Sequence, residues 1–216
     1  MSKRTAFVVA GGDVDAEDLA LIDPERDWVV AADGGALTLL DAGIIPHLVV
    51  GDFDTVGEHF AAQLAARGIP IRKLPAAKAE TDTHYAAREA LRQNPDEVII
   101  LGALGGSRFD HTLANLGLLE WLDEQGVQGI LYHRSNRIRL VSGPGEAVLA
   151  ESKFSFVSLI PVTAAAEGIT TVGMLYPLRG ETLLRGMTRG ISNEIVGREG
   201  KIIIEKGKCL LVESRD

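Results

Sequence analysis

The sequence predicts an α/β protein: an N-terminal Rossmann-like parallel sheet domain followed by a smaller C-terminal antiparallel β-sandwich domain. Three observations lead to this prediction. Continuous apolar runs alternate with helical spacing up to about residue 134, polar turns follow the apolar runs directly, and short strand-like segments replace the helical spacing from residue 135. Apolar runs without period-two alternation are typical of parallel strands that helices cover on both faces.

In the first part, the expected elements alternate along the chain. Strands are expected at residues 5–10, 28–32, 48–50, 71–74, 97–101 and 129–132, and helices at residues 14–21, 36–40, 58–67, 84–93 and 112–124. Gly68 is a residue type that ends a helix in a left-handed conformation, so it suits the end of the third helix. Thr81 suits the N-cap of the fourth.

In the second part, turn residues separate short apolar segments. Strands are expected at residues 138–141, 147–149, 154–160, 168–172, 181–184, 201–205 and 209–212. Short strands at this spacing are typical of an antiparallel sandwich or barrel. We therefore expect domains at residues 1–134 and 135–216. The second is small, so it needs to pack against the first or against another chain.

The composition excludes some classes of partner. The 216 residues carry a formal net charge of −8, and 46% of them are hydrophobic. An acidic surface argues against nucleic acid, whose phosphates need a basic face. It does not argue against a nucleotide, since a metal ion can supply positive charge locally. No apolar window approaches a membrane span, so no membrane partner is expected. The single cysteine, Cys209, permits no disulfide within the chain and fits a reducing, cytoplasmic setting.

The segment Gly51-Asp52-Phe53-Asp54-Thr55 follows the apolar run at residues 48–50. Side chains two apart on an extended chain point to the same side, so Asp52 and Asp54 can converge. Two such carboxylates repel each other unless a cation lies between them. Mg²⁺ is the hard cation that accepts carboxylate oxygens and keeps waters for a phosphate substrate. The alternative is an aspartate-rich surface loop, because Asp is common in turns.

Two more polar loops follow predicted strands. Asp33-Gly34-Gly35 is either a tight turn or a place where backbone N–H groups and the next helix N-terminus approach a phosphate. Lys78-Ala79-Glu80-Thr81-Asp82 is either an acidic, capped helix start or a loop with a function. In the functional interpretation, Asp82 is a third metal carboxylate and Lys78 contacts phosphate.

The loop Gly105-Gly106-Ser107-Arg108-Phe109-Asp110-His111 combines a glycine pair with an arginine, an aspartate and a histidine. Arg108 could hold phosphate oxygens with its planar guanidinium. Asp110 could bind a metal, orient His111 or cap the helix. His111 could donate to a phosphate, shuttle a proton, or be structural. The other histidines show no metal-ligand spacing and are interpreted as structural: His47, His59, His84 and His133.

The loops described so far all follow predicted parallel strands. In such sheets the carboxyl ends of the strands share one edge, and ligands bind outside it. We therefore expect these loops to gather at one site. The segment Gly190-Ile191-Ser192-Asn193-Glu194 lies apart from them, in the β-part. It is either a turn, since Ser and Asn bond their own backbone there, or a polar contact to a small organic substrate.

Taken together, the motifs resemble the thiamine pyrophosphokinase (thiamin diphosphokinase) family over nearly the whole chain. Four segments match the nucleotide half of the family in order: Ala32-Asp33-Gly34-Gly35, Gly51-Asp52-Phe53-Asp54-Thr55, Thr81-Asp82 and Gly105-Gly106-Ser107-Arg108-Phe109-Asp110-His111. Three segments resemble the thiamine-binding half of the family: Ser158-Leu159-Ile160-Pro161, Tyr176-Pro177-Leu178 and Gly190-Ile191-Ser192-Asn193-Glu194. The resemblance implies a nucleotide-binding domain at 1–134 and a thiamine-binding β-sandwich at 135–216. It also implies a homodimer with sites near the subunit interface.

The resemblance also implies an activity: Mg²⁺-dependent transfer of a pyrophosphoryl group from ATP to the hydroxyl of thiamine, giving thiamine diphosphate and AMP. The implied magnesium ligands are Asp52, Asp54 and Asp82, which with Arg108 are the catalytic residues. The implied nucleotide-binding residues are Asp33, Gly34, Gly35, Lys78, Gly105, Gly106, Asp110 and His111. Ser192 and Asn193 are the expected thiamine contacts. The proton acceptor is expected to be a nearby carboxylate, Asp54 or Asp82.

One loop departs from the family pattern, which has acids at positions 77 and 79. This chain has Ala77 and Ala79, while Lys78 and Asp82 remain and Glu80 could compensate. Two alternatives stay open, the first because of this departure and the second because of the Asp52 and Asp54 pair. One is a non-catalytic thiamine or thiamine diphosphate binding protein of the same fold. The other is a Mg²⁺-dependent phosphohydrolase that uses one aspartate of the Asp52 segment as nucleophile.

Overall fold

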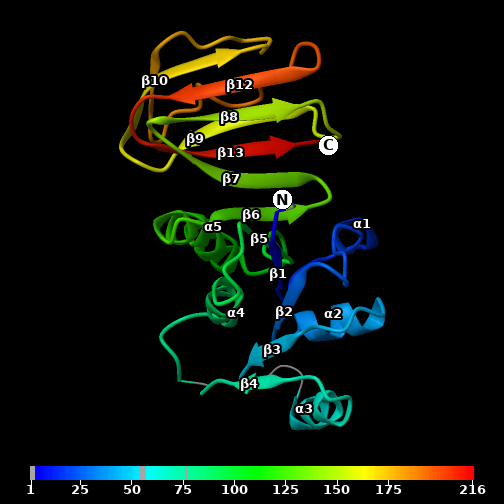
Figure 1. The fold of residues 1–216 in the computed structure, drawn as a ribbon. Helices are drawn as coiled ribbons and strands as arrows, with labels where there is room; N and C mark the ends of the chain where they lie inside the picture. Colours follow the sequence, from blue (N-terminus) through cyan, green and yellow to red (C-terminus); the bar gives the residue numbers. More distant parts are fainter. Residues whose placement is uncertain (1–2, 54–56, 76) are drawn as a thin grey trace. The chain divides into compact units, whose positions relative to one another are not determined.

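The computed structural model describes residues 3–53, 57–75 and 77–216 and confirms the predicted fold class (Figure 1). Helices and parallel strands alternate first, and antiparallel strands follow. The chain divides into two compact units, Met1–Arg134 and Ser135–Asp216. No helix in the described part of the chain is long and apolar enough to cross a membrane.

Unit 1 contains a parallel sheet with the strand order β4-β3-β2-β1-β5-β6. The strands are β1 (Thr5–Val9), β2 (Trp28–Ala32), β3 (Leu48–Gly51), β4 (Ile71–Lys73), β5 (Glu97–Leu101) and β6 (Gln128–His133). Val8 of β1 lies opposite Val30 of β2 on one side and Ile100 of β5 on the other. The strand order therefore reverses next to β1. Open α/β sheets bind ligands at such switch points.

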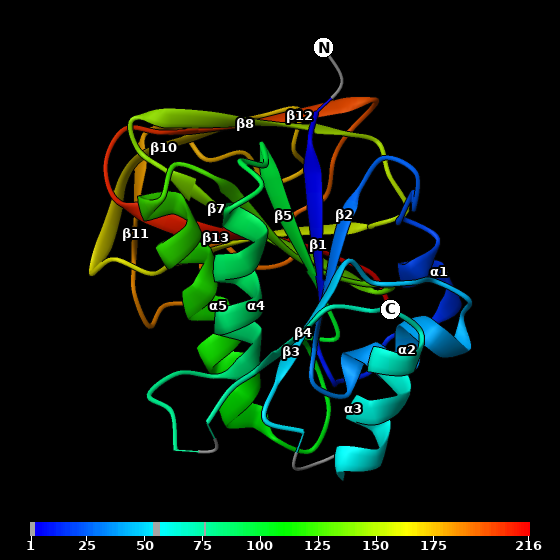
Figure 2. The same ribbon diagram turned by 60° about the horizontal axis from the view of Figure 1, so that its bottom comes forward.

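Helices cover both faces of this sheet (Figure 2). One face carries α4 (Asp82–Leu91) and α5 (Phe109–Glu124), and the other carries α1 (Ala16–Leu19), α2 (Gly35–Asp41) and α3 (Gly57–Ala66). This cover explains the continuous apolar runs, because β1 and β2 are buried along almost their whole length. The largest fully buried side chains include Phe7, Leu39, Ile100 and Leu119. Burial of each such side chain stabilises the fold by about 1.5–3 kcal/mol.

The predicted helix ends at Gly68 and Thr81 are confirmed. Gly68 has φ +73°, and the N–H of Ile69 donates to the Leu64 carbonyl at 3.0 Å, which closes the end of α3. The hydroxyl of Thr81 accepts from the His84 N–H at 3.2 Å, which caps α4.

The predicted start of α5 is wrong, because this helix begins at Phe109 and not at Thr112. The preceding turn is made by Gly105 and Gly106, with φ angles of +81° and +78°. After this left-handed turn the chain can enter the helix at once, and the His111 N–H donates to the Arg108 carbonyl at 3.1 Å. Helix α1 is also shorter than the predicted 14–21, because Asp15 forms a capping box that starts it at Ala16.

Unit 2 consists of two antiparallel sheets with the orders β7-β13-β9 and β11-β10-β12-β8. The strands are β7 (Asn136–Ser142), β8 (Gly145–Ala150), β9 (Phe156–Pro161), β10 (Ala165–Val172), β11 (Glu181–Leu184), β12 (Glu199–Ile204) and β13 (Lys208–Ser214). Side chains from both sheets form one buried cluster, which includes Leu149, Ile169, Ile202, Cys209 and Leu211. This shared core is the sandwich interior.

Candidate active site

Unit 1 has a cleft of about 850 Å³ at the carboxyl ends of its central strands. The ends of β1, β2 and β5 and the loops after them contribute residues 10–13, 32–34, 102–103 and 105–107, and residues 78–83 line the cleft where α4 begins. The cleft therefore lies at the carboxyl edge of the sheet, where the sequence predicts a site, and next to β1, where the strand order reverses. It is lined by these residues singled out in the sequence: Asp33, Gly34, Lys78, Asp82, Gly105, Gly106, Arg108 and His111.

The cleft floor is made largely of closely packed backbone. A Cβ on Gly12 would lie 2.3 Å from the Gly102 carbonyl oxygen, and the Gly12 N–H donates to that oxygen at 3.1 Å. A Cβ on Gly35 would lie 2.0 Å from the Val9 carbonyl oxygen. Gly35 is buried at the start of α2. Its place in the fold is explained by the close approach of α2 to β1.

Three side chains form an ion-pair cluster, which we call the Lys78 cluster: Asp52, Lys78 and Asp82. The Lys78 ammonium donates to Asp52 Oδ2 and lies 3.2 Å from Asp82 Oδ1. All three side chains are largely buried, with 11%, 9% and 23% of their surface exposed, respectively. Asp54, the other predicted magnesium ligand, lies outside the described residues.

The contacts within the cluster shift the pKa values of Asp82 and Lys78. Burial raises the pKa of Asp82, and repulsion from Asp52 and Asp33 raises it further, against the opposing effect of Lys78. Burial alone favours a neutral Lys78 amine, but its contacts with Asp52 and Asp82 outweigh burial and raise the Lys78 pKa. Lys78 therefore stays protonated and balances part of a crowded group of carboxylates.

The donor chemistry of this region fits a hard divalent cation. Asp33, Asp52 and Asp82 are close enough for the first two to perturb the third, and carboxylate oxygens are the ligands that Mg²⁺ takes. Among the described residues, however, no three His, Cys, Asp or Glu side chains are grouped around one point as a ready metal site. A cation at Asp52 and Asp82 would have to take the place of the lysine ammonium.

Glu80 is a second acidic feature of the cleft wall. Its Oε1 accepts from Arg88 at 2.6 Å. Its Oε2 is buried and has no hydrogen-bond partner within the described part of the chain. A buried carboxylate oxygen without a donor is costly, so Glu80 is poised for a donor from a ligand. It is the acid nearest in sequence to Ala79.

Arg108 and Asp110 form a bidentate pair at the start of α5. Arg108 Nε lies 2.9 Å and its Nη2 2.6 Å from the two Asp110 oxygens. Both side chains are exposed. Donation from Arg108 lowers the pKa of Asp110 to about 2. His111 lines the cleft, whereas Asp110 is turned to Arg108. Asp110 therefore holds the arginine in this structure.

Two polar residues of α5 were missed by the sequence interpretation. Asn115 is buried and donates to the Ala103 carbonyl at 2.9 Å, and the Thr112 hydroxyl donates to the Gly105 carbonyl at 3.4 Å. These bonds tie the glycine loop to the helix behind it. Their signal in the sequence is a pair of polar residues three apart on a mostly apolar helix, which lie on one face.

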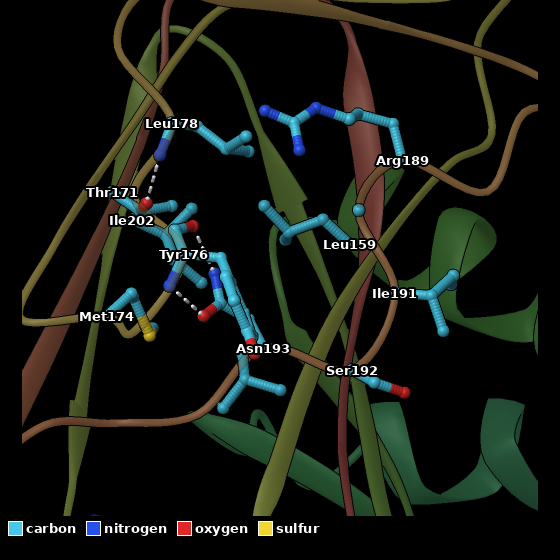
Figure 3. A pocket seen from close by; sticks show the side chains of 12 residues that line it. Leu159, Thr171, Met174, Tyr176, Leu178, Arg189, Ile191, Ser192, Asn193 and Ile202 are labelled. Atoms are coloured by element: carbon cyan, nitrogen blue, oxygen red, sulfur yellow. Dashed lines mark hydrogen bonds between the residues drawn. The ribbon is translucent and has the colours of Figure 1, made fainter.

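Unit 2 contains a second, smaller pocket of about 270 Å³ (Figure 3). It is lined by Val157, Leu159, Thr171, Met174, Tyr176, Leu178, Arg189, Gly190, Ile191, Ser192, Asn193 and Ile202. The walls are mostly apolar, and the polar groups come from few side chains. Ser192 and Asn193, the expected thiamine contacts, both belong to this pocket.

Asn193 uses its amide to shape the pocket. Its Oδ1 accepts from the N–H groups of Tyr176 and Glu194, both at 2.9 Å, and its Nδ2 donates to the Tyr176 carbonyl at 2.7 Å. The amide therefore holds the segment of Tyr176 in place. Ser192 has φ +56°, its N–H donates to Ser158 Oγ at 3.0 Å, and Figure 3 shows its hydroxyl pointing away from Met174 and Tyr176.

Arg189 and Thr171 are pocket residues that the sequence did not reveal. Arg189 forms two hydrogen bonds of 3.1 Å with Glu181, so its charge is balanced beside the apolar walls. The Thr171 hydroxyl accepts from the Leu178 N–H at 2.8 Å. Thr171 is distant in sequence from residues 190–194, and only the folding of the chain brings it to the pocket. Arg189 directly precedes that segment, but its pairing with Glu181 leaves no signal in the sequence.

The chain matches known proteins along most of its length. Residues 21–131 match the family model described as thiamin pyrophosphokinase, catalytic domain. Residues 147–209 match the model of its vitamin B1 binding domain. The thiamine pyrophosphokinase of Bacillus subtilis is 32% identical over 215 residues, which cover 99% of this chain and 100% of the relative.

Solved structures of thiamine pyrophosphokinases also match this chain. The crystal structure of the Bacillus subtilis thiamine pyrophosphokinase matches with a TM-score of 0.89 over 99% of this chain and 100% of that chain. That of the Geobacillus thermodenitrificans enzyme matches with a TM-score of 0.86 at 30% identity, over 98% of both chains. Thiamin pyrophosphokinase from Candida albicans shares the fold, with a TM-score of 0.81 at 17% identity over 99% of this chain and 90% of that chain.

The α/β unit with its cleft, the β-sandwich and these matches define an enzyme of the kinase type, a diphosphotransferase. The chain belongs to the thiamin pyrophosphokinase family.

Proposed function

We propose that this protein transfers a pyrophosphoryl group from ATP to the hydroxyl of thiamine, with Mg²⁺ as cofactor. The observation that carries the proposal is the cleft at the strand reversal, where a backbone floor meets the Lys78 cluster. N–H groups of such a floor suit phosphate oxygens. Family membership supports thiamine as the acceptor.

The chain's own side chains have separate tasks in this reaction. The turns at Asp33-Gly34 and Gly105-Gly106 cradle the nucleotide phosphates, and Arg108, Lys78 and His111 balance their charge. Asp52 and Asp82, with Asp54, would hold Mg²⁺. When bound, the metal would supply positive charge that offsets the negative charge of the phosphate oxygens.

The bonds exchanged follow from the products. The thiamine hydroxyl oxygen attacks the β-phosphorus of ATP and forms a new P–O bond. The bond from that phosphorus to the oxygen bridging to the α-phosphate breaks, and AMP leaves with that oxygen. The hydroxyl proton passes to a carboxylate, Asp54 or Asp82. Positioning and charge neutralisation provide most of the catalysis in such transfers.

The thiamine site is proposed to involve the pocket of unit 2, near Ser192 and Asn193. Its apolar walls suit the rings of a small organic substrate. We also propose a homodimer with shared sites. Large exposed apolar side chains support it: Tyr176, Leu184, Met187 and Ile191 of unit 2 are each more than a third exposed.

The test is thiamine-dependent AMP formation by the purified protein, compared with its Asp52→Asn variant. The proposal expects equal amounts of AMP and thiamine diphosphate from the wild type and a nearly complete loss in the variant. Calorimetric binding of thiamine without any AMP would instead favour a non-catalytic binding protein, the alternative raised by Ala77 and Ala79. AMP release without thiamine would contradict both.

A further inference from the structure

Lys78 lies where the proposed metal would bind. Its ammonium contacts both Asp52, which follows β3, and Asp82, the first residue of α4. Its side chain is only 9% exposed. A charged amine this buried needs partners, and here the two carboxylates supply them. Without the lysine, these carboxylates would face each other across a region that excludes most water.

The same carboxylate oxygens cannot make full contacts with the lysine ammonium and with a divalent cation at the same time. Mg²⁺ needs close oxygen ligands in near-octahedral geometry, and the ammonium already occupies the space between Asp52 and Asp82. Two cations that share ligands also repel each other. Binding of the metal must therefore break or loosen the contacts of Lys78.

We propose that Lys78 is a resident counter-ion that competes with Mg²⁺ for Asp52 and Asp82, and that metal binding releases its ammonium toward the phosphates in the cleft. This inference rests on the proposed function. In the metal-free protein the lysine keeps the carboxylates together. In the loaded cleft it has a new anionic partner, since Lys78 lines the cleft alongside the phosphate-binding turns.

A consequence is that the binding of the metal and the binding of the nucleotide are coupled. Without nucleotide, the released ammonium has lost its partners, so Mg²⁺ binds weakly. With nucleotide, phosphate oxygens replace those partners, so each ligand strengthens binding of the other. Lys78 is then a positioning residue that makes the metal site complete only when the nucleotide is present.

The test is calorimetric titration of the full chain with MgCl₂ in the absence of nucleotide. Lys78→Met removes the competing ammonium and keeps an apolar stem of similar length. We expect the variant to bind Mg²⁺ roughly ten- to a hundredfold more tightly, the range set by a hydrogen bond to a charged group. Lys3→Met is the matched control. Lys3 pairs with Glu97 at the amino end of β5, so this change removes one charge away from the cleft and leaves Mg²⁺ binding unchanged.

A second measurement, thermal unfolding, distinguishes a change in metal binding from a loss of the fold. Without metal, Lys78→Met should unfold at a lower temperature than wild type, and saturating Mg²⁺ should raise its midpoint more than that of the wild type. If Lys78→Met does not fold, Lys78→Gln serves in both experiments. Equal or weaker Mg²⁺ binding by the variant overturns the inference and leaves the proposed metal site standing. Absence of Mg²⁺ binding in wild type and variant alike overturns both, whereas thiamine-dependent AMP formation tests the proposed function separately.

Discussion

Replacement of Asn193 by alanine should disturb the proposed thiamine pocket of unit 2 without reaching the cleft of unit 1. The change removes the amide that donates once to and accepts once from the backbone of Tyr176, and that accepts from the Glu194 N–H. The backbone pair between Asn193 and Val157, at 2.7 and 2.9 Å, remains. The strand edge should therefore persist while the segment of Tyr176 loses its anchor.

The magnitude follows from the three bonds. A typical hydrogen bond contributes a net ~0.5–1.5 kcal/mol. Asn193 is half-buried, so water replaces part of the loss, and we expect unfolding free energy to fall by about 1–3 kcal/mol. Tyr176 lines the same pocket. The KM for thiamine should therefore rise by more than about tenfold, while the KM for ATP changes little.

The assay combines denaturant unfolding with steady-state kinetics in both substrates. Ser192→Ala is the matched control. The hydrogen bond recorded for Ser192 comes from its backbone N–H, so this variant should keep its stability and report a direct hydroxyl contact through KM alone. An Asn193→Ala protein with wild-type stability and wild-type KM for thiamine would refute the reasoning. So would an equal rise in both KM values.

Two further predictions concern other parts of the chain. Ala79→Asp places an acid beside Lys78, and it should lower the Mg²⁺ concentration needed for half-maximal rate. An unchanged or higher requirement, measured by the same titration of activity, would indicate that Glu80, with its buried Oε2, already fills that role. Burial raises the pKa of the Cys209 thiol from 9.0 to about 11. The folded state thus keeps a proton that the unfolded state releases, and stability falls as pH rises from 9.0 toward about 11. Unfolding curves at several pH values should show a steeper fall for wild type than for Cys209→Ala, and parallel falls would contradict a buried, protonated thiol.

The fold could be predicted because its main signals are local. Apolar runs such as residues 28–32 reported burial on both faces, and Gly68 and Thr81 marked helix ends by their own conformational preferences. The start of α5 could not be predicted in this way. Two consecutive left-handed glycines, Gly105 and Gly106, let the helix begin immediately after the turn, and no capping side chain signals its first residue.

The candidate site was predictable where it depends on strand ends and not where it depends on side-chain partners. The placement of Asp33, Lys78 and Asp82 at one cleft follows from the parallel sheet. The ion pairs of Lys78 with two carboxylates depend on distances between segments far apart in sequence. The same holds for Asn193, whose residue type suggested a ligand contact but whose amide bonds the backbone of Tyr176.

The most direct measurement is turnover of ATP that carries a radioactive β-phosphorus, with products separated by chromatography. Pyrophosphoryl transfer places the label in thiamine diphosphate and leaves AMP unlabelled, in equal amounts and only when thiamine is present. Label that remains in ADP, or appears as inorganic phosphate without thiamine, would contradict attack at the β-phosphorus in this cleft.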